Sequence, residues 1–189
     1  MLKTKITPLA LVLASLSAPA TANLVISEYV EGSSYNKAVE LFNNSTTPLS
    51  LDGYTLSLYS NGNTEANNTL DLTGELAANS TYVIVNGNAS VELKEKADQL
   101  SAVTNFNGDD ALVLTQGSTV IDSFGQRGVD PGSFWSEGGV QTQNKTLRRK
   151  ETQLNGRTDA DGAFNPSELW LQFDQDDFSD LGIFAGNSS

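Results

Sequence analysis

The chain has 189 residues and is acidic, with 23 Asp and Glu against 11 Lys and Arg and a formal net charge of −12. It contains no cysteine and no histidine. These counts exclude a disulfide framework, Cys/His zinc sites, Ser-His-Asp hydrolysis and histidine-based nuclease chemistry within this chain. Any catalysis would have to use carboxylates, lysine, tyrosine or hydroxyl groups.

Residues 1–22 have the pattern of a secretory signal peptide. Lys3 and Lys5 form a basic start, the letters PLALVLASLSA form a short apolar run, and Ala20 and Ala22 are the small residues that signal peptidase requires. The run is too short for a membrane span, so we expect none in the mature chain. Cleavage before Asn23 removes two lysines and no acid, which changes the net charge from −12 to −14. We therefore expect an exported protein, secreted or at the cell surface, with weak or absent DNA binding by itself.

The rest of the chain reads as short β-strands separated by turns rich in Asn, Gly, Ser and Asp. In residues 23–30 the alternation puts Leu24 and Ile26 on one side, with Glu28 next in the same series. Four further strands are predicted at residues 37–43, 53–60, 68–74 and 81–86. This half of the molecule is therefore expected to be sheet.

One helix is predicted, at residues 89–100, with Ser90 as its N-cap. Its apolar positions are Val91, Leu93, Ala97 and Leu100. Glu92 and Lys94 form a local E-x-K pattern, but a carboxylate metallonuclease needs two or three acids beside the lysine. No acid pair is placed to complete that set, so metallonuclease chemistry is disfavoured.

A hairpin is predicted over residues 110–125, with Gly117 in its turn. Asp109 and Asp110 precede it, and they are either a metal-holding pair or the polar start of a strand. Short polar side chains suit the point where a turn becomes a strand, and no third carboxylate follows at strand spacing. The start of a strand is therefore the favoured interpretation.

A long loop, residues 125–139, follows the hairpin and leads to a predicted strand in residues 145–151. Residues 156–173 are predicted as another long connection that ends in a strand-like run. Aromatic and guanidinium groups are common anchors of contact surfaces. The candidate contact surface is Arg127, Phe134, Trp135, Arg148 and Arg149. The alternatives are that the two aromatic residues attach their loop to the sandwich and that the arginines lie on a solvated strand face.

Two acidic segments could bind cations. Asp159, Asp161, Asn165 and Glu168 offer hard oxygen ligands suited to a structural Ca²⁺ ion, although their spacing falls short of an EF-hand and an ordinary Asx-rich loop is the alternative. No other cofactor is expected. The second segment, residues 174–180, contains four aspartates that either repel one another in solvent or share a cation. Solvation is favoured for these.

About eight strands without strand–helix alternation predict an all-β fold, a two-sheet antiparallel β-sandwich with one short helix and long loops. The chain shows no internal repeat and no second composition regime. We therefore expect one domain, at residues 23–186, followed by a tail or the start of a linker at residues 187–189. The domain is expected to be monomeric.

Several short motifs occur in the order found in a known family. The patterns I-x-E, EL-x-N and L-x-G-Y-x-L lie at residues 26–28, 40–43 and 51–56. Later motifs lie at residues 107–125, 146–150, 162–170 and 178–186, with Gly162 in place of the usual acid. Together they resemble the lamin tail domain, and most closely its bacterial version in secreted and surface nucleases. The resemblance spans essentially the whole mature chain.

The resemblance implies an immunoglobulin-like sandwich and a non-catalytic accessory module. In the nuclease family this module precedes an oligonucleotide-binding-type barrel and an endonuclease/exonuclease/phosphatase domain, so the expected partner is a C-terminal nuclease domain of the same parent protein. One alternative is a fragment of an extracellular deoxyribonuclease whose catalytic domain lies C-terminal to this chain. Another is a stand-alone surface adhesion or protein-interaction domain.

Six residues are assigned structural roles within these motifs: Glu28, Glu40, Gly53, Tyr54, Asp122 and Trp170. The two glutamates lie in otherwise apolar strands, where an unpaired charge is costly. They should therefore face solvent or meet donors, and Arg148 and Arg149 are the candidate partners because guanidinium groups match carboxylates well.

Overall fold

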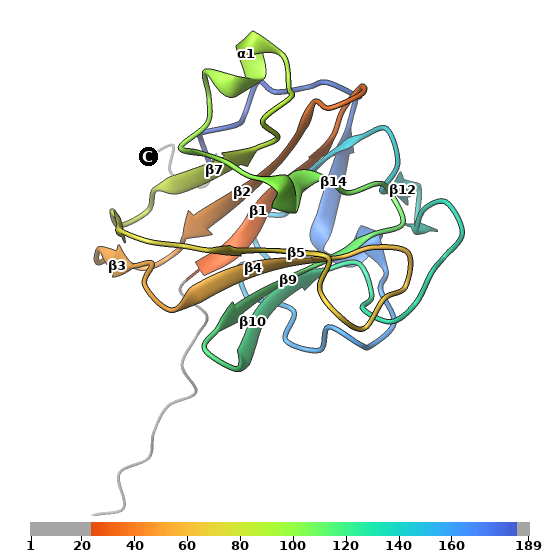
Figure 1. Ribbon diagram of the computed structural model, residues 1–189, viewed down its shortest axis with the longest axis horizontal. Coiled ribbons are helices and arrows are strands. Elements are labelled where there is room, and N and C mark those ends of the chain that lie inside the picture. The colour runs from red at the N-terminus through yellow and green to blue at the C-terminus, as the bar shows by residue number, and fades with distance from the viewer. Residues whose placement is uncertain (1–23, 185–189) are drawn as a thin grey trace, which may run out of the picture.

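The computed structural model describes residues 24–184, so the predicted signal peptide and the tail lie outside the described residues. Two β-sheets pack face to face (Figure 1), which confirms the predicted sandwich. The larger sheet contains, in spatial order, β14 (Trp170–Phe173), β13 (Thr146–Arg149), β1 (Leu24–Glu31), β2 (Lys37–Asn43), β7 (Thr81–Val85) and β8 (Gln99–Leu100). The smaller sheet contains β10 (Thr119–Phe124), β9 (Ala111–Gln116), β4 (Tyr54–Tyr59) and β5 (Asn68–Asp71).

Short elements complete the described chain. Two ribbons pair β3 (Leu49–Ser50) with β6 (Glu75–Leu76) and β11 (Ser136–Glu137) with β12 (Val140–Gln141). The helices are α1 (Val91–Lys94), the 3₁₀ turn η1 (Ala102–Thr104) and α2 (Pro166–Leu169). Every strand pair is antiparallel except that of β7 with β8, which is parallel.

A β-bulge in β1 decides which side of the larger sheet Glu28 faces. The pairing of β1 with β2 shifts between Ile26 and Glu28. Leu24, Ile26 and Tyr29 all lie in the core between the sheets, so Ser27 and Glu28 both lie on the outer face. Strict alternation would have continued the Leu24–Ile26 series with Glu28 in the core. The bulge instead keeps a carboxyl group out of an apolar environment where it would be costly.

An aromatic stack fills the centre of the core. The Tyr29 ring stacks on Phe106 and Phe124, with centroid distances of 4.6 and 4.0 Å. Trp170 is fully buried and meets Phe124 edge-on at 5.2 Å. Burying each such ring contributes roughly 1.5–3 kcal/mol to stability, so β1, β10 and β14 are held together by these contacts.

The outer face of the larger sheet is also covered. After β14, residues 174–184, here called the C-terminal segment, cross this face. Phe178 and Leu181 belong to the same buried cluster as Val30 and Val83, and Leu93 of α1 joins that cluster. All the residues of β1 and β2 are consequently buried, because both faces of these strands are covered.

The predicted helix is shorter in the structure. Its N-cap is correct, since the Ser90 hydroxyl accepts a hydrogen bond from the Leu93 amide at 3.3 Å. The helical stretch ends at Lys94, however, and residues 99–100 form β8. Asp98 explains the change: its amide donates to the Val83 carbonyl and its carboxylate accepts from the Val83 amide. Pairing with the sheet therefore replaces the helix.

A second helix, α2, lies where the sequence predicted a long connection. The Asn165 side chain caps it by accepting from the Ser167 amide, and Pro166 occupies its first turn. Asparagine followed by proline is a helix-start signal that sequence reasoning could have used. The predicted hairpin of β9 and β10 is present, with Gly117 at a positive φ of 56°.

Candidate functional site

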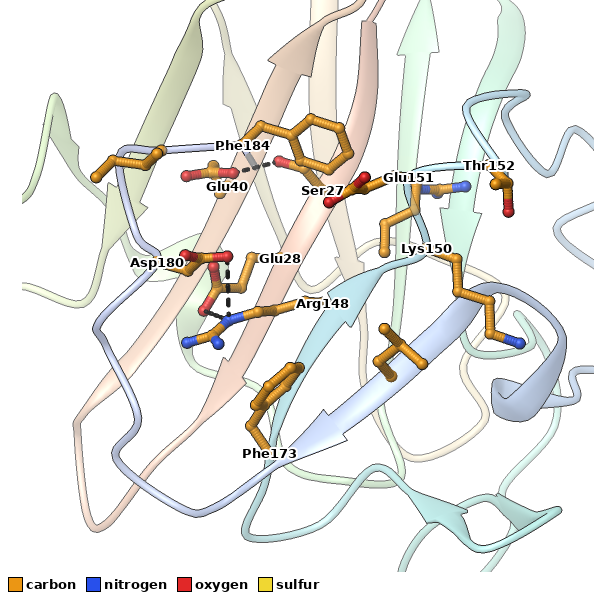
Figure 2. A pocket seen from close by; sticks show the side chains of 13 residues that line it. Ser27, Glu28, Glu40, Arg148, Lys150, Glu151, Thr152, Phe173, Asp180 and Phe184 are labelled. Carbon is orange, nitrogen blue, oxygen red and sulfur yellow. Dashed lines mark hydrogen bonds and ion pairs between the residues drawn. The ribbon is translucent and has the colours of Figure 1, made fainter. Parts of the chain in front are cut away.

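A cavity of about 430 Å³ opens on the outer face of the larger sheet, between β1, β2, β13 and β14 and the C-terminal segment. Figure 2 shows that acidic, basic and apolar side chains meet in it. The charged groups at its centre are Glu28, Glu40, Arg148 and Asp180. The apolar groups are Leu171, Phe173, Ile183 and Phe184. A concave site with apolar walls and a few convergent polar groups is the usual form of a ligand pocket.

Arg148 is the central cation of this cavity. Its Nε lies 3.5 Å from Glu28 Oε1 and 3.7 Å from Asp180 Oδ2. One terminal nitrogen donates to Asp177 at 2.9 Å, and the guanidinium carbon lies 4.0 Å from the centre of the Phe173 ring. One positive charge therefore faces three carboxyl groups, with Glu40 beside them.

The two glutamates differ in their partners. Glu40 accepts a hydrogen bond from the Ser27 hydroxyl at 2.6 Å and another from the Gly182 amide at 2.7 Å. Glu28 has only the long contact to Arg148, and its Oε2 accepts no hydrogen bond from the described residues. Glu28 is nevertheless only 2% exposed. The residue is thus buried, and the oxygen without a protein donor is in contact with the open space of the cavity.

Burial changes the protonation of both carboxyl groups. Desolvation, followed by the neighbouring charge of Glu40, raises the pKa of Glu28 to about 8, against the opposing effect of Arg148. Desolvation raises the pKa of Glu40 to about 7, opposed by its bonds to Ser27 and Gly182. At neutral pH, Glu28 is therefore mostly protonated. Strongly shifted carboxyl groups in a cavity are typical of functional sites.

Arg149 does not belong to this cavity's charged centre, and its prediction as a contact-surface residue or a partner of the glutamates is wrong. Its side chain is fully buried and pairs with Asp122, whose carboxylate also accepts the amides of Ile26 and Arg157, each at 2.8 Å. Alternation along β13 explains the difference, because adjacent residues face opposite sides of a sheet. Arg148 faces outward to Glu28, whereas Arg149 faces Asp122.

Trp135 is also unsuited to the predicted contact surface, because it is buried in the core and packs edge-on against Phe164 at 5.6 Å. It attaches its loop to the sandwich, the alternative considered for it. Phe134 and Arg127 remain partly exposed. Arg127 makes a two-point interaction with Asp161, at 2.7 and 3.0 Å, which raises its pKa further.

Three of the four predicted calcium ligands, Asp159, Asp161 and Asn165, have other roles in the structure. Asp161 binds Arg127, Asn165 caps α2, and Asp159 accepts the amides of Asp161 and Gly162 within its own turn. Arg157 also contacts this loop: it donates to the carbonyls of Gly162 and Ala163, and the charges of Asp159, Asp161 and Glu168 act on it. Calcium binding here stays a prediction from the sequence.

The aspartates of the C-terminal segment contact several partners, and Asp177 and Asp180 share Arg148. Asp176 accepts the Ser33 amide at 2.9 Å, Asp177 binds Arg148, and Asp174 lies 3.6 Å from Lys145. Within residues 24–184, no group of three or more acidic side chains is placed to hold a metal ion. These acids attach the segment to different parts of the sandwich.

Asp110 immediately precedes β9, as the sequence predicted. Its carboxylate accepts the amides of Asn61 and Asn107, both at 2.8 Å, so it closes two turns. Burial raises its pKa. Glu92 lies exposed on α1, and neither it nor Asp110 lines the cavity. Backbone hydrogen bonding is therefore the role that the structure gives to Asp110.

A family model described as the lamin tail domain matches residues 17–128, more than half of the chain. The chain belongs to the lamin tail domain family. Among solved structures, it is similar to a DUF4876 family protein from Bacteroides thetaiotaomicron, with a TM-score of 0.50 and 12% identity over 89% of this chain and 74% of that one. At this identity the likeness concerns the fold alone. No curated protein matches the chain.

The lamin tail domain is a non-catalytic immunoglobulin-like module, so the match confirms both the family and the fold class expected from the sequence. The family model ends before β13, β14 and the C-terminal segment. The cavity therefore combines strands of the matched region with later elements. No helix within residues 24–184 is long and apolar enough to span a membrane.

Proposed function

We propose that this lamin tail domain is a non-catalytic recognition module of an exported protein and that it acts beside an extracellular nuclease. The signal-peptide pattern of residues 1–22 supports export, and the motif resemblance to secreted bacterial nucleases supports the nuclease context. The observation that carries a recognition role is the cavity on the outer face of the larger sheet.

The charged groups of the cavity are suited to recognition. Ser27 and Gly182 hold the carboxylate of Glu40, and Arg148 is shared between Glu28, Asp177 and Asp180. Phosphodiester hydrolysis by carboxylates needs acids that converge on metal ions. The net charge of −12 further opposes the approach of a nucleic acid backbone. The module would therefore contact a protein or another non-nucleic ligand.

A nuclease assay tests the absence of catalysis. The purified chain, incubated with supercoiled plasmid DNA in Mg²⁺ and Ca²⁺, is expected to produce no more nicked or linear DNA than its Glu28→Gln and Glu40→Gln variants produce. Cleavage by the wild type that either substitution abolishes would overturn the proposal, because the cavity would then perform the chemistry.

A mobility-shift assay tests the proposal that the module does not bind DNA. We expect no complex with single- or double-stranded DNA at about 50 mM or about 200 mM salt, because an acidic surface gains nothing from counterion release. A complex that persists at the higher salt concentration would contradict this part of the proposal.

A further inference from the structure

We propose that the cavity beside Glu28 binds a primary ammonium group on an apolar stem, as presented by a lysine side chain of a partner polypeptide. The proposal concerns the chemistry of the cavity and stands whether or not a nuclease domain accompanies this module. It rests on three features: an excess of carboxylates, an unpaired carboxyl oxygen and an exposed apolar wall.

The charges that face the cavity do not balance. Four acids line it, Glu28, Glu40, Glu151 and Asp180, against the three bases Arg148, Arg149 and Lys150. Arg149 is paired with the buried Asp122, and the ammonium group of Lys150 keeps its charge while donating to the carbonyls of Ser167 and Glu168, at 2.7 and 3.3 Å. The remaining charge is therefore negative when the glutamates are ionised, which favours a cationic ligand.

Glu28 supplies the most direct indication of a donor ligand. The residue is 98% buried, since its exposed fraction is 2%, and it lines the cavity. Its Oε2 accepts no hydrogen bond from the described residues, and its Oε1 lies at the long distance of 3.5 Å from Arg148. An ammonium group has three N–H donors, enough to bond Glu28 and a neighbouring carboxylate together.

The shape and lining of the cavity favour an organic cation over a metal ion. Within the described part of the chain, no three acidic side chains are close enough to share a metal. Leu171 and Ile183 are 49% and 61% exposed and lie at the cavity, beside Phe173 and Phe184. The four methylene groups of a lysine side chain could cover this wall while its head group reaches the carboxylates.

Binding should be coupled to proton release. A nearby positive charge favours the ionised form of a carboxyl group, so the ligand would displace the proton that Glu28 carries at neutral pH. The titratable and charged groups around Glu28 are Glu40 on β2, Arg148 on β13, Lys150 and Glu151 after β13, and Asp177 and Asp180 in the C-terminal segment. Affinity is therefore expected to increase with pH while the lysine stays charged.

An NMR titration of the full chain tests the proposal. The probes are n-butylamine and the peptide acetyl-Gly-Lys-Gly-amide, and the control peptide carries norleucine, which has the same chain length without the charge. We expect saturable shifts of the Ser27 and Gly182 amides with both amines and none with the norleucine peptide. Affinity for the lysine peptide should rise on the order of tenfold or more between about pH 6 and about pH 8.5.

Matched substitutions locate the site. Glu28→Gln should weaken binding of the lysine peptide at least about tenfold at the higher pH and reduce the pH dependence. Glu92→Gln removes the same charge from exposed α1 and should leave affinity unchanged. The pH dependence of the wild type tests the proposal even if the Glu28 variant folds poorly. Absent binding, equal binding of the norleucine peptide, or binding of free amine alone would overturn it.

Discussion

Asp122 and Glu28 are both buried carboxyl groups, and the structure surrounds them very differently. Asp122 accepts three backbone amides and pairs with Arg149. Glu28 meets one guanidinium nitrogen at 3.5 Å, and its pKa is raised by burial. Donors make the charged form of a carboxyl group tolerable inside a protein, and without them the group becomes neutral. Asp122 therefore organises the fold, whereas Glu28 is available for a ligand.

The first residue-scale prediction concerns Asp122. Asp122→Ala would leave Arg149 and three amides without their acceptor, and breaking one side of a buried charge pair costs about 3–5 kcal/mol. Urea denaturation should show a decrease of that size in the free energy of unfolding. The matched variant Glu75→Gln alters an exposed carboxylate and should change stability by less than about 0.5 kcal/mol. Equal effects of the two substitutions would contradict the assigned role.

The second residue-scale prediction is the pH dependence contributed by Glu28. Its pKa is raised from 4.5 to about 8 in the folded chain, so between these values the folded state retains a proton that the unfolded state has lost. This contribution to stability is fully present below the lower value and is lost as pH rises through the higher one, at up to ~1.4 kcal/mol per pH unit. Glu28→Gln removes it.

Chemical denaturation at several pH values measures this effect. The stability of the Glu28→Gln variant relative to wild type should increase by about 2–4 kcal/mol between about pH 5 and about pH 8.5. Glu40, whose pKa is raised to about 7, adds a slope of the same sign in both proteins, and because the two glutamates interact, the difference measures the loss of Glu28 together with its coupling to Glu40. A constant difference across this range would mean that Glu28 titrates normally.

At the scale of elements, the C-terminal segment determines which part of the outer face of the larger sheet is covered and where the cavity forms. It covers the outer face of β1 and β2, supplies one wall of the cavity, and bonds Glu40 through the Gly182 amide. Its position depends on the bulge in β1, which puts Ser27 and Glu28 on the face that the segment crosses. The bulge in β1 and the C-terminal segment therefore form the cavity together.

The element-scale prediction tests this attachment. Phe178 is buried against the larger sheet, so Phe178→Ala should lower the free energy of unfolding by about 2–4 kcal/mol and speed proteolysis within residues 174–184. Val91→Ala truncates a side chain that is 68% exposed and should be nearly neutral. Unchanged proteolysis in the Phe178 variant would show that the segment is held mainly by its polar contacts.

At the scale of the whole molecule, three arginines of this acidic chain connect segments that are distant in the sequence. Arg148 contacts Glu28, Arg149 pairs with Asp122, and Arg157 donates to the Ser123 hydroxyl and the Gly125 carbonyl. These partners lie on β1 and at β10, far from the arginines in the sequence. Each guanidinium offers several donors in a fixed geometry, which suits it to join several segments at once.

The sequence by itself determined the strands, the hairpin with Gly117, the Ser90 cap and the sandwich class, because alternation, capping and turn chemistry are local. Motif order also indicated the family that the comparison then showed. Only some of the cavity residues could be predicted from the sequence. Glu28, Glu40 and Arg148 were indicated as charges within apolar strands and Asp180 as one of four clustered aspartates, whereas no pattern singled out Ser27 or Gly182.

Tertiary structure alone decided which side Glu28 faces, where the predicted helix ends and which arginine meets which acid. The bulge reverses the alternation of β1 after Ile26, and pairing of Asp98 with Val83 replaces the last helical turns by β8. Arg148 and Glu28 are 120 positions apart, and their contact follows from the register of β1 with β13. The bulge, the end of the helix and the arginine–acid contacts depend on how strands that are distant in the sequence pack together. The local sequence pattern does not report the energies of that packing.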